Sequence, residues 1–413
     1  MNTPKIRFKG FTDDWEQRKL GALMEDGIIL EQSDGNHGEL YPRSEEFVNE
    51  GIPYIAASSI SSDGERIDFN LTKYLSMERA IQFRKGVAKN GDVLLAHNAT
   101  VGPSVMLSMD YEFAILSTSL TLYRLDKEKM SPMFFLQAIR SGYFQKQLEV
   151  FMKQTTRSQV PILTQRNLQI SYPINKVEQE RIGEFLSNLD HLITLHQRKC
   201  DETKQLKKFM LQKMFPKNGE KNPKIRFEGF TDDWEQRKLG DVLKERTERA
   251  KGEEELLSVT IANGVIRQAD SEKRNIASED KRNYKVVKKG DIPYNSMRMW
   301  QGAVGNSQYD GIVSPAYTIL VPTDEANDKF FMELFKKENS LQRFKRWSQG
   351  LTSDTWNLKY PALSTMQFFI PSIKEQKRIA NCLQELDYLI TLHQRKCEKL
   401  KALKKFMLQN MFI

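Results

Sequence analysis

The feature that most constrains this chain is a pair of internal repeats that frame two unlike segments. The opening segment 4–20 (PKIRFKGFTDDWEQRKL) returns at 223–239 with one change in 17 positions. A closing segment containing LITLHQRKC and LKKFMLQ occurs at 192–212 and again at 389–409. The opening copies are 219 residues apart and the closing copies 197, so the second insert is 22 residues shorter. Near-identical frames around unlike inserts predict one fold used twice, with two specificities.

The composition and the net charge limit the classes to which this protein can belong. At 413 residues, 39% of them hydrophobic, the chain is long enough for two or three domains with separate cores. Its net charge of +9 favours a polyanionic partner such as nucleic acid, although a merely solvated basic surface is the plainer interpretation. The three cysteines lack CxxC spacing, and neither a signal peptide nor an 18-residue apolar run is present. We therefore expect a cytoplasmic protein without a disulfide framework, a zinc site or a membrane partner.

The closing segments predict two long helices, over 178–215 and 375–412. Apolar residues recur there at three- and four-residue steps, acidic residues gather at each start and lysines at each end. This charge order suits an antiparallel coiled coil, in which a 38-residue helix would span roughly 57 Å, or about 17 base pairs of DNA. The residues predicted for helix pairing and subunit docking are Leu189, Leu192, Ile193, His196, Leu206, Leu386, Leu389, Ile390, His393 and Leu403. We interpret the two histidines as polar residues between the helices.

The predicted fold class is α+β, with two mixed α/β domains separated by these helices in a pseudo-two-fold repeat. The predicted order is a first domain at 1–177, a helix at 178–215, a linker at 216–222, a second domain at 223–374 and a helix at 375–412. Strands are expected at 52–56, 92–96, 120–125, 257–261, 291–294 and 316–321, and helices at 131–148 and 328–344. The opening segments are interpreted as structural frames, with Trp15 in the core and Asp13 and Glu16 at capping-box spacing.

Motifs for bond chemistry are missing from the sequence. It contains no GxGxxG or Walker loop, no Pro-Pro pair for an amino-methyltransferase motif, and no metal-ligand spacing among its five histidines. We therefore predict a non-catalytic protein, with no catalytic residue, no metal and no cofactor bound by this chain.

The sequence does contain residues that are suited to binding DNA. Direct readout of DNA needs Arg, Asn, Gln, Ser and Thr on rigid loops, and each insert has two loops of this kind. One follows a predicted strand, at 97–102 or 295–305; the other lies at 153–168 or 347–360. The predicted contacts are His97, Asn98, Thr100, Thr156, Arg157, Ser158 and Gln159 in the first insert, and Asn295, Ser296, Arg298, Trp300, Gln301, Thr352 and Ser353 in the second. An ordinary polar hairpin is the alternative for any one of them, and the two arginines fit guanine best.

The organisation resembles a known family. The FxGFTDDWEQRKLG openings, the LITLHQRKC and LKKFMLQxMF helices, the KxGD strands at 89–93 and 288–292, and the EQxRI junctions after a proline carry the resemblance. Over nearly its whole length the chain is similar to the specificity (S) subunit of Type I restriction-modification systems.

The resemblance implies a non-catalytic subunit that reads a bipartite, asymmetric site in double-stranded DNA, one half-site for each domain, with the helices setting the spacer. It implies two methyltransferase (M) subunits on the helical region, which carry S-adenosylmethionine and methylate adenine at N6. Restriction (R) subunits would add cleavage that depends on ATP and Mg²⁺. The family pattern assigns no base contact to a single position, so the contacts above rest on loop chemistry.

Two other classes stay open on the sequence. A tandem-domain, sequence-specific DNA-binding regulator would act without methyltransferase partners. A coiled-coil scaffold would show no salt-dependent DNA binding.

Overall fold

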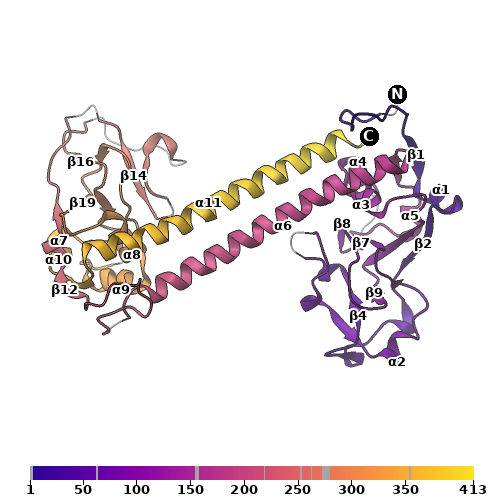
Figure 1. The fold of residues 1–413 in the computed structure, drawn as a ribbon, viewed down its shortest axis with the longest axis horizontal. Helices are drawn as coiled ribbons and strands as arrows, with labels where there is room; N and C mark the ends of the chain where they lie inside the picture. Colours follow the sequence, from indigo (N-terminus) through magenta and orange to yellow (C-terminus); the bar gives the residue numbers. More distant parts are fainter. Residues whose placement is uncertain are drawn as a thin grey trace. The chain divides into compact units, whose positions relative to one another are not determined.

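The computed structural model describes residues 3–61, 64–153, 158–217, 219–251, 254–261, 263–271, 280–352 and 355–413. The chain divides into two compact units. Unit 1 comprises Met1–Arg198 together with His393–Ile413, and unit 2 comprises Lys199–Leu392 (Figure 1). Each unit therefore combines one insert with a part of both long helices.

The closing repeats form the helices α6 (Lys176–Lys213) and α11 (Ile373–Asn410), each of 38 residues. Both helices begin and end two residues earlier than predicted. Each starts with an acidic residue in its first turn, Glu178 or Glu375, where a negative charge stabilises the helix dipole. The prediction of two long helices is confirmed.

The two helices run antiparallel within each unit. In unit 1 the Cys397 sulfur lies 4.0 Å from the Ile193 carbonyl oxygen, and Lys404 pairs with Asp190. Later residues of α11 therefore lie beside earlier residues of α6, as in an antiparallel pair. Unit 2 has the same order, in the contacts Cys200–Ile390 and Lys207–Asp387.

The predicted apolar stripe divides into a buried and an exposed set. Leu189, Ile193 and Leu386 are buried, as are Cys200 and Cys397. His196 and His393 face each other, with their Nδ1 atoms 3.0 Å apart and their ring centroids 5.2 Å apart, so they lie between the helices as predicted. Ile390 is half-buried. The remaining members are 39–43% exposed: Leu192, Leu206, Leu389 and Leu403.

The repeated opening segments form equivalent frames. In unit 1, β1 (Glu16–Lys19) pairs antiparallel with β11 (Gln169–Tyr172); in unit 2, β12 (Glu235–Lys238) pairs with β20 (Gln367–Ile370). Each first strand leads into a short helix, α1 (Leu20–Glu25) or α7 (Leu239–Val242). The Asp13–Glu16 spacing therefore does not mark a helix start, because Glu16 begins a strand that the pairing with β11 holds extended.

An aromatic trio closes each frame. The preserved tryptophan of the opening segment, Trp15 or Trp234, is 2% exposed. In unit 2 its ring packs on Phe330 and on Phe215, which follows α6, at centroid distances of 5.9 and 6.2 Å. The rings of Trp15, Phe134 and Phe412 form the same arrangement in unit 1. The end of each long helix is thereby fixed to one domain.

Unit 1 contains two larger sheets in its insert (Figure 1). One is antiparallel, in the order β2 (Ile29–Asp34), β10 (Leu120–Leu125), β7 (Val93–Asn98) and β8 (Thr100–Met106). The other has the order β3 (Phe47–Val48), β5 (Lys73–Leu75), β4 (Ile52–Ile55), β9 (Ala114–Leu116) and β6 (Val87–Ala88), with only β4 and β9 parallel. Helices α2 (Met77–Ala80), α3 (Pro132–Arg140), α4 (Gly142–Lys153) and α5 (Ile162–Gln165) complete the insert.

Unit 2 keeps a shorter version of the first sheet. Its order is β13 (Leu243–Glu245), β19 (Tyr317–Pro322) and β17 (Ile292–Asn295), matching β2, β10 and β7. Two antiparallel pairs, β14 (Leu257–Thr260) with β15 (Gly264–Arg267) and β16 (Lys285–Val287) with β18 (Gly311–Val313), replace the second sheet. The helices are α8 (Asp328–Lys336), α9 (Glu338–Trp347) and α10 (Tyr360–Thr365).

Each helix predicted within an insert is in fact two. The predicted helix 131–148 breaks between α3 and α4, and the predicted helix 328–344 breaks between α8 and α9. The residue at each break, Ser141 or Lys337, has an extended backbone with ψ of 151° or 141°. The apolar spacing continues across both breaks, which is why the sequence pattern did not reveal them.

The aromatic trio yields a stability prediction. Phe215→Ala should destabilise the protein by about 3–5 kcal/mol, because the ring is 1% exposed and packs on two aromatic neighbours. Urea denaturation would measure the change. Phe209→Ala, at a ring that is 46% exposed, is the matched control and should stay within about 0.5 kcal/mol of wild type. Equal midpoints for the two variants would contradict the anchoring role.

Candidate nucleic-acid interface

The strand that leads to the candidate interface is fixed at its start in the same way in both units. In unit 1 the buried carboxylate of Asp92 accepts hydrogen bonds from the Lys89 backbone N–H (2.8 Å) and the Arg124 guanidinium (2.7 Å). In unit 2 Asp291 accepts from the Lys288 backbone N–H and from Arg246. The KxGD sequence therefore holds the start of β7 and of β17 in position.

The two predicted loops of unit 1 lie side by side. Strand β7 turns into β8 at Ala99, whose φ of 64° is in the left-handed region. The Ala99 N–H donates to the Ser158 carbonyl (3.0 Å), and Asn98 forms a β-bridge with Gln159. Thr100 and Ser158 are exposed, while Asn98 and Gln159 are half-buried. Thr156 and Arg157 lie outside the described residues.

His97, predicted as a DNA contact, is a buried residue of the sheet. It is 5% exposed, its Nδ1 lies 2.5 Å from the Thr121 hydroxyl oxygen, and its Nε2 lies 3.1 Å from the Thr118 carbonyl oxygen. Burial lowers the pKa of His97 to about 4, so the ring is neutral at pH 7. Both ring nitrogens have partners, Thr121 on β10 and Thr118 in the loop before it, so neither nitrogen of the buried ring faces solvent. Its geometry is that of a residue that positions the loop.

Ser296 occupies the corresponding place in unit 2. It is 4% exposed, and its hydroxyl lies 2.8 Å from that of Thr318 on the neighbouring strand. Its carbonyl accepts a hydrogen bond from the Leu358 N–H (2.9 Å), as the His97 carbonyl accepts one from Val160 (2.9 Å). Both residues therefore join the strand end to the second loop rather than face solvent.

The remaining predicted residues of unit 2 surround a short turn. The Asn295 side chain accepts from the Met297 N–H (3.0 Å) and caps the turn, leaving Arg298 exposed beside it. Trp300 and Gln301 are half-buried. Thr352 is exposed on the second loop, where its N–H donates to the Thr355 hydroxyl (3.1 Å). Ser353 lies outside the described residues.

Three residues that were not predicted, Lys345, Trp347 and Trp356, complete this surface. The Trp300 ring packs edge-on against Trp356, with centroids 5.3 Å apart, and so connects the two loops. Lys345 Nζ lies 5.8 and 5.4 Å from the two ring centroids. Trp347, at the end of α9, is 45% exposed. The signal was present in the alternation of basic and aromatic residues at 343–347 and 356, but that run reads equally well as an ordinary amphipathic helix end.

This arrangement brings donors, acceptors and aromatic faces together on one surface of unit 2. Arg can bind a guanine edge, Asn and Thr can pair with other bases, and a lysine beside aromatic rings can contact phosphate. Among the described residues no group of three or more His, Cys, Asp or Glu side chains could hold a metal ion. In the part of the chain that the structure describes, no helix is long and apolar enough to cross a membrane.

Comparison with known proteins places the chain in a family. Type I restriction modification DNA specificity domains match residues 12–205 and 231–402. The chain therefore belongs to the family of Type I restriction-modification specificity subunits and carries two copies of its domain.

Its relatives include a protein of Methanocaldococcus jannaschii described as a type I restriction enzyme MjaX specificity subunit. The two are 23% identical over 420 residues, which cover 98% of this chain and 94% of the relative. Among solved structures, the S subunit of a Type I restriction-modification system from M. genitalium has a TM-score of 0.63 at 15% identity, covering 100% of this chain and 99% of that one. This likeness shows that the fold is shared.

The buried histidine yields a prediction of pH dependence. Because the folded-state pKa of His97, about 4, lies below the unfolded value of about 6.5, its contribution to stability is complete above about pH 6.5 and is lost as the pH falls toward 4. His97→Gln should therefore lose less stability than wild type between about pH 7 and pH 5. Thermal unfolding at the two pH values would measure this. An identical pH dependence of both proteins would show that His97 does not titrate as its burial implies.

Proposed function

We propose that each unit of this specificity subunit reads one half of a bipartite, asymmetric site in double-stranded DNA. The observation that carries the proposal is the pair of polar loops joined at the end of β7 in unit 1 and of β17 in unit 2. The backbone arrangement is alike in the two units, whereas the side chains differ. Like scaffolds with unlike side chains suit two half-sites of different sequence.

The side chains suggest how each half-site is read. In unit 1 the exposed candidates are small and polar, Thr100 and Ser158, with Asn98 beside them. In unit 2 Arg298 stands exposed on a turn that Asn295 caps, so its guanidinium could reach a guanine edge in the major groove. Lys345 would contact the DNA backbone rather than a base, because a lysine held near aromatic rings offers a point charge.

We further propose that two methyltransferase subunits dock on the long helices. The repeated LKKFMLQ sequence exposes the same pair in each unit: Leu206 and Phe209 on α6 in unit 2, Leu403 and Phe406 on α11 in unit 1. Members of a pair are three residues apart and so share one helix face. The side chains of these pairs are 42–51% exposed, although other apolar residues of the same helices are buried. Exposed apolar residues of this kind favour contact with a partner protein. Because the two apolar pairs are identical in sequence, we expect each to bind one copy of the same partner.

The chemistry would then reside in the partners. In this scheme the methyltransferase subunits bind S-adenosylmethionine and methylate adenine, and restriction subunits supply cleavage with ATP and Mg²⁺. This chain contributes sequence recognition and spacing, and binds no cofactor itself. A regulator that acts alone would have no use for two identical exposed helix patches, so we favour the subunit over the regulator.

Mapping methylated adenines in cells that contain this subunit and its methyltransferase partner tests the DNA-reading proposal. Wild type should methylate a bipartite, asymmetric site. Arg298→Ala should relax one base position in one half-site, at a cost of about 1–3 kcal/mol in binding, because a bidentate contact is lost. Lys345→Ala is the control and should weaken binding to all sequences alike while lowering the salt slope by about 0.9. A uniform effect of Arg298→Ala would make it a phosphate contact instead.

Native mass spectrometry with the partner tests the docking proposal. Phe209→Asp should remove the methyltransferase subunit on unit 2 and Phe406→Asp the one on unit 1, because each places a charge in an apolar contact. Each single variant should therefore bind one copy, and the double variant none. Lys146→Asp, on the exposed surface of α4, should still bind two copies. Two copies bound by the double variant would place the docking surface elsewhere.

A further inference from the structure

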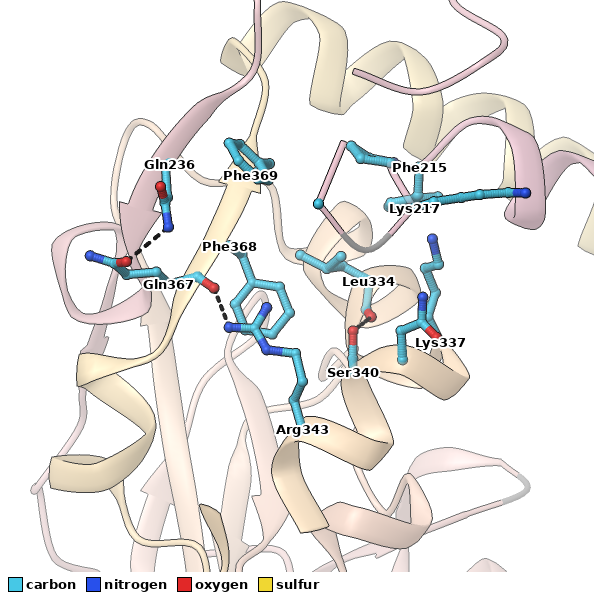
Figure 2. A pocket seen from close by; sticks show the side chains of 13 residues that line it. Phe215, Lys217, Gln236, Leu334, Lys337, Ser340, Arg343, Gln367, Phe368 and Phe369 are labelled. Atoms are coloured by element: carbon cyan, nitrogen blue, oxygen red, sulfur yellow. Dashed lines mark hydrogen bonds between the residues drawn. The ribbon is translucent and has the colours of Figure 1, made fainter. Parts of the chain in front are cut away.

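Unit 2 contains a basic cleft that neither its recognition loops nor its helix pairing uses. An inner pocket of about 180 Å³ lies between the end of α6, α8 and α9, and the β12–β20 pair (Figure 2). A second hollow, of about 810 Å³, lies along the last turns of α6, and Lys217 and Lys337 line both. The two hollows together are called the cleft. Part of the wall is apolar, formed by Leu211, Phe215, Leu334 and Phe368.

The charge of the cleft is not balanced. Six cationic side chains line it: Lys208, Lys213, Lys217, Lys336, Lys337 and Arg343. Two carboxylates, Glu333 and Glu338, also line it, but Glu333 already pairs with Lys207 at 3.2 Å. Burial lowers the pKa of Lys337 to about 8, and the pKa of Arg343 is also lowered by burial. A half-buried positive charge costs free energy unless an anion approaches it.

The two central cations are held in place by the aromatic walls. Lys337 Nζ lies 4.6 Å from the centroid of the Phe215 ring, and the Arg343 guanidinium lies 4.0 Å from that of Phe368. Arg343 also donates a hydrogen bond to the Gln367 carbonyl (Figure 2). The positive charges therefore have fixed positions at the pocket, as a binding site for an anion requires.

Unit 1 has different residues at the matching positions. The break between its helices is Ser141 where unit 2 has Lys337, and the side chain that bonds to the β-pair is Gln147 where unit 2 has Arg343. Tyr143 lies between them, accepting a hydrogen bond from Gln17 (2.7 Å) and donating one to Gln169 (3.2 Å). A neutral network thus replaces the two cations in unit 1, and this pair of cations is a property of unit 2.

We propose that this cleft receives an acidic, partly apolar segment of the methyltransferase subunit docked on unit 2, which gives the two docking positions unequal affinities. The cleft includes Lys208, which neighbours Phe209 of the docking patch, so one partner could cover both. Apolar walls around fixed cations fit acidic and hydrophobic side chains together, whereas the backbone of duplex DNA brings phosphates without apolar surface. The inference rests on the docking proposal above.

Titration of single-site backgrounds with the purified methyltransferase subunit tests the inference. In Phe406→Asp, where only unit 2 can dock, Lys337→Met should raise the Kd about tenfold, because a charge-assisted contact is lost. In Phe209→Asp, where only unit 1 can dock, the same substitution should change nothing. Lys146→Met removes an equal charge from exposed α4 in unit 1 and should leave both Kd values unchanged. Lys217→Gln, at the rim, should act in the same direction as Lys337→Met and does not alter the buried wall.

The outcomes separate the two proposals. A Kd unaffected by Lys337→Met and by Lys217→Gln, with the subunit still bound, would overturn the cleft and leave the docking proposal standing. Weaker DNA binding with unchanged subunit binding would assign the cleft to a DNA phosphate and likewise overturn it. Failure of the wild-type chain to bind the methyltransferase subunit would overturn the docking proposal itself.

Discussion

A buried carboxylate at the first turn of each long helix is the interaction on which this architecture depends. Glu178 is fully buried and accepts two hydrogen bonds from Arg7, at 2.6 and 2.8 Å, and Glu375 accepts two from Arg226, at 2.9 and 2.8 Å. Removing one partner of such a pair leaves an uncompensated charge inside the protein, at a cost of about 3–5 kcal/mol. Because the arginines belong to the opening repeats and the carboxylates to the closing helices, each frame closes on itself around an insert. The aromatic trio then fixes the far end of the other helix to the same frame.

The sequence was sufficient for the features that depend on periodicity and repetition. The two long helices, their antiparallel pairing, the burial of Trp15 and the matched order of strands in the inserts all follow from patterns that many residues share. The predicted strand 120–125 coincides with β10, and the other predicted strands lie within two residues of observed ones. A pattern that occurs twice in equivalent places predicts a helix or strand more strongly than a single copy does.

The details of the candidate site depended on single positions, where sequence patterns carry little information. His97 and Ser296 have the residue types of base-reading side chains, yet each is buried and contacts a threonine on the neighbouring strand, a contact that depends on the sheet register. Lys337 breaks a helix whose apolar spacing continues unchanged, so no local pattern marks the position. Trp356 joins the candidate surface through a ring contact with Trp300, 56 residues away in the chain. Long-range contacts of this kind were outside the reach of spacing arguments.

The division of the chain into units also sets an order of assembly during synthesis. Unit 2 is one continuous stretch, so all of its residues are available once the ribosome has passed Leu392. Unit 1 is discontinuous: the hydrophobic face around Trp15 and Phe134 packs on Phe412, which is synthesised after all the residues of unit 2. Part of the core of unit 1 must therefore stay uncovered until the residues of unit 2 have been synthesised. Until residues 393–413 have been synthesised, unit 1 exposes apolar surface that unit 2 does not, which makes unit 1 the half more prone to aggregation and to chaperone binding.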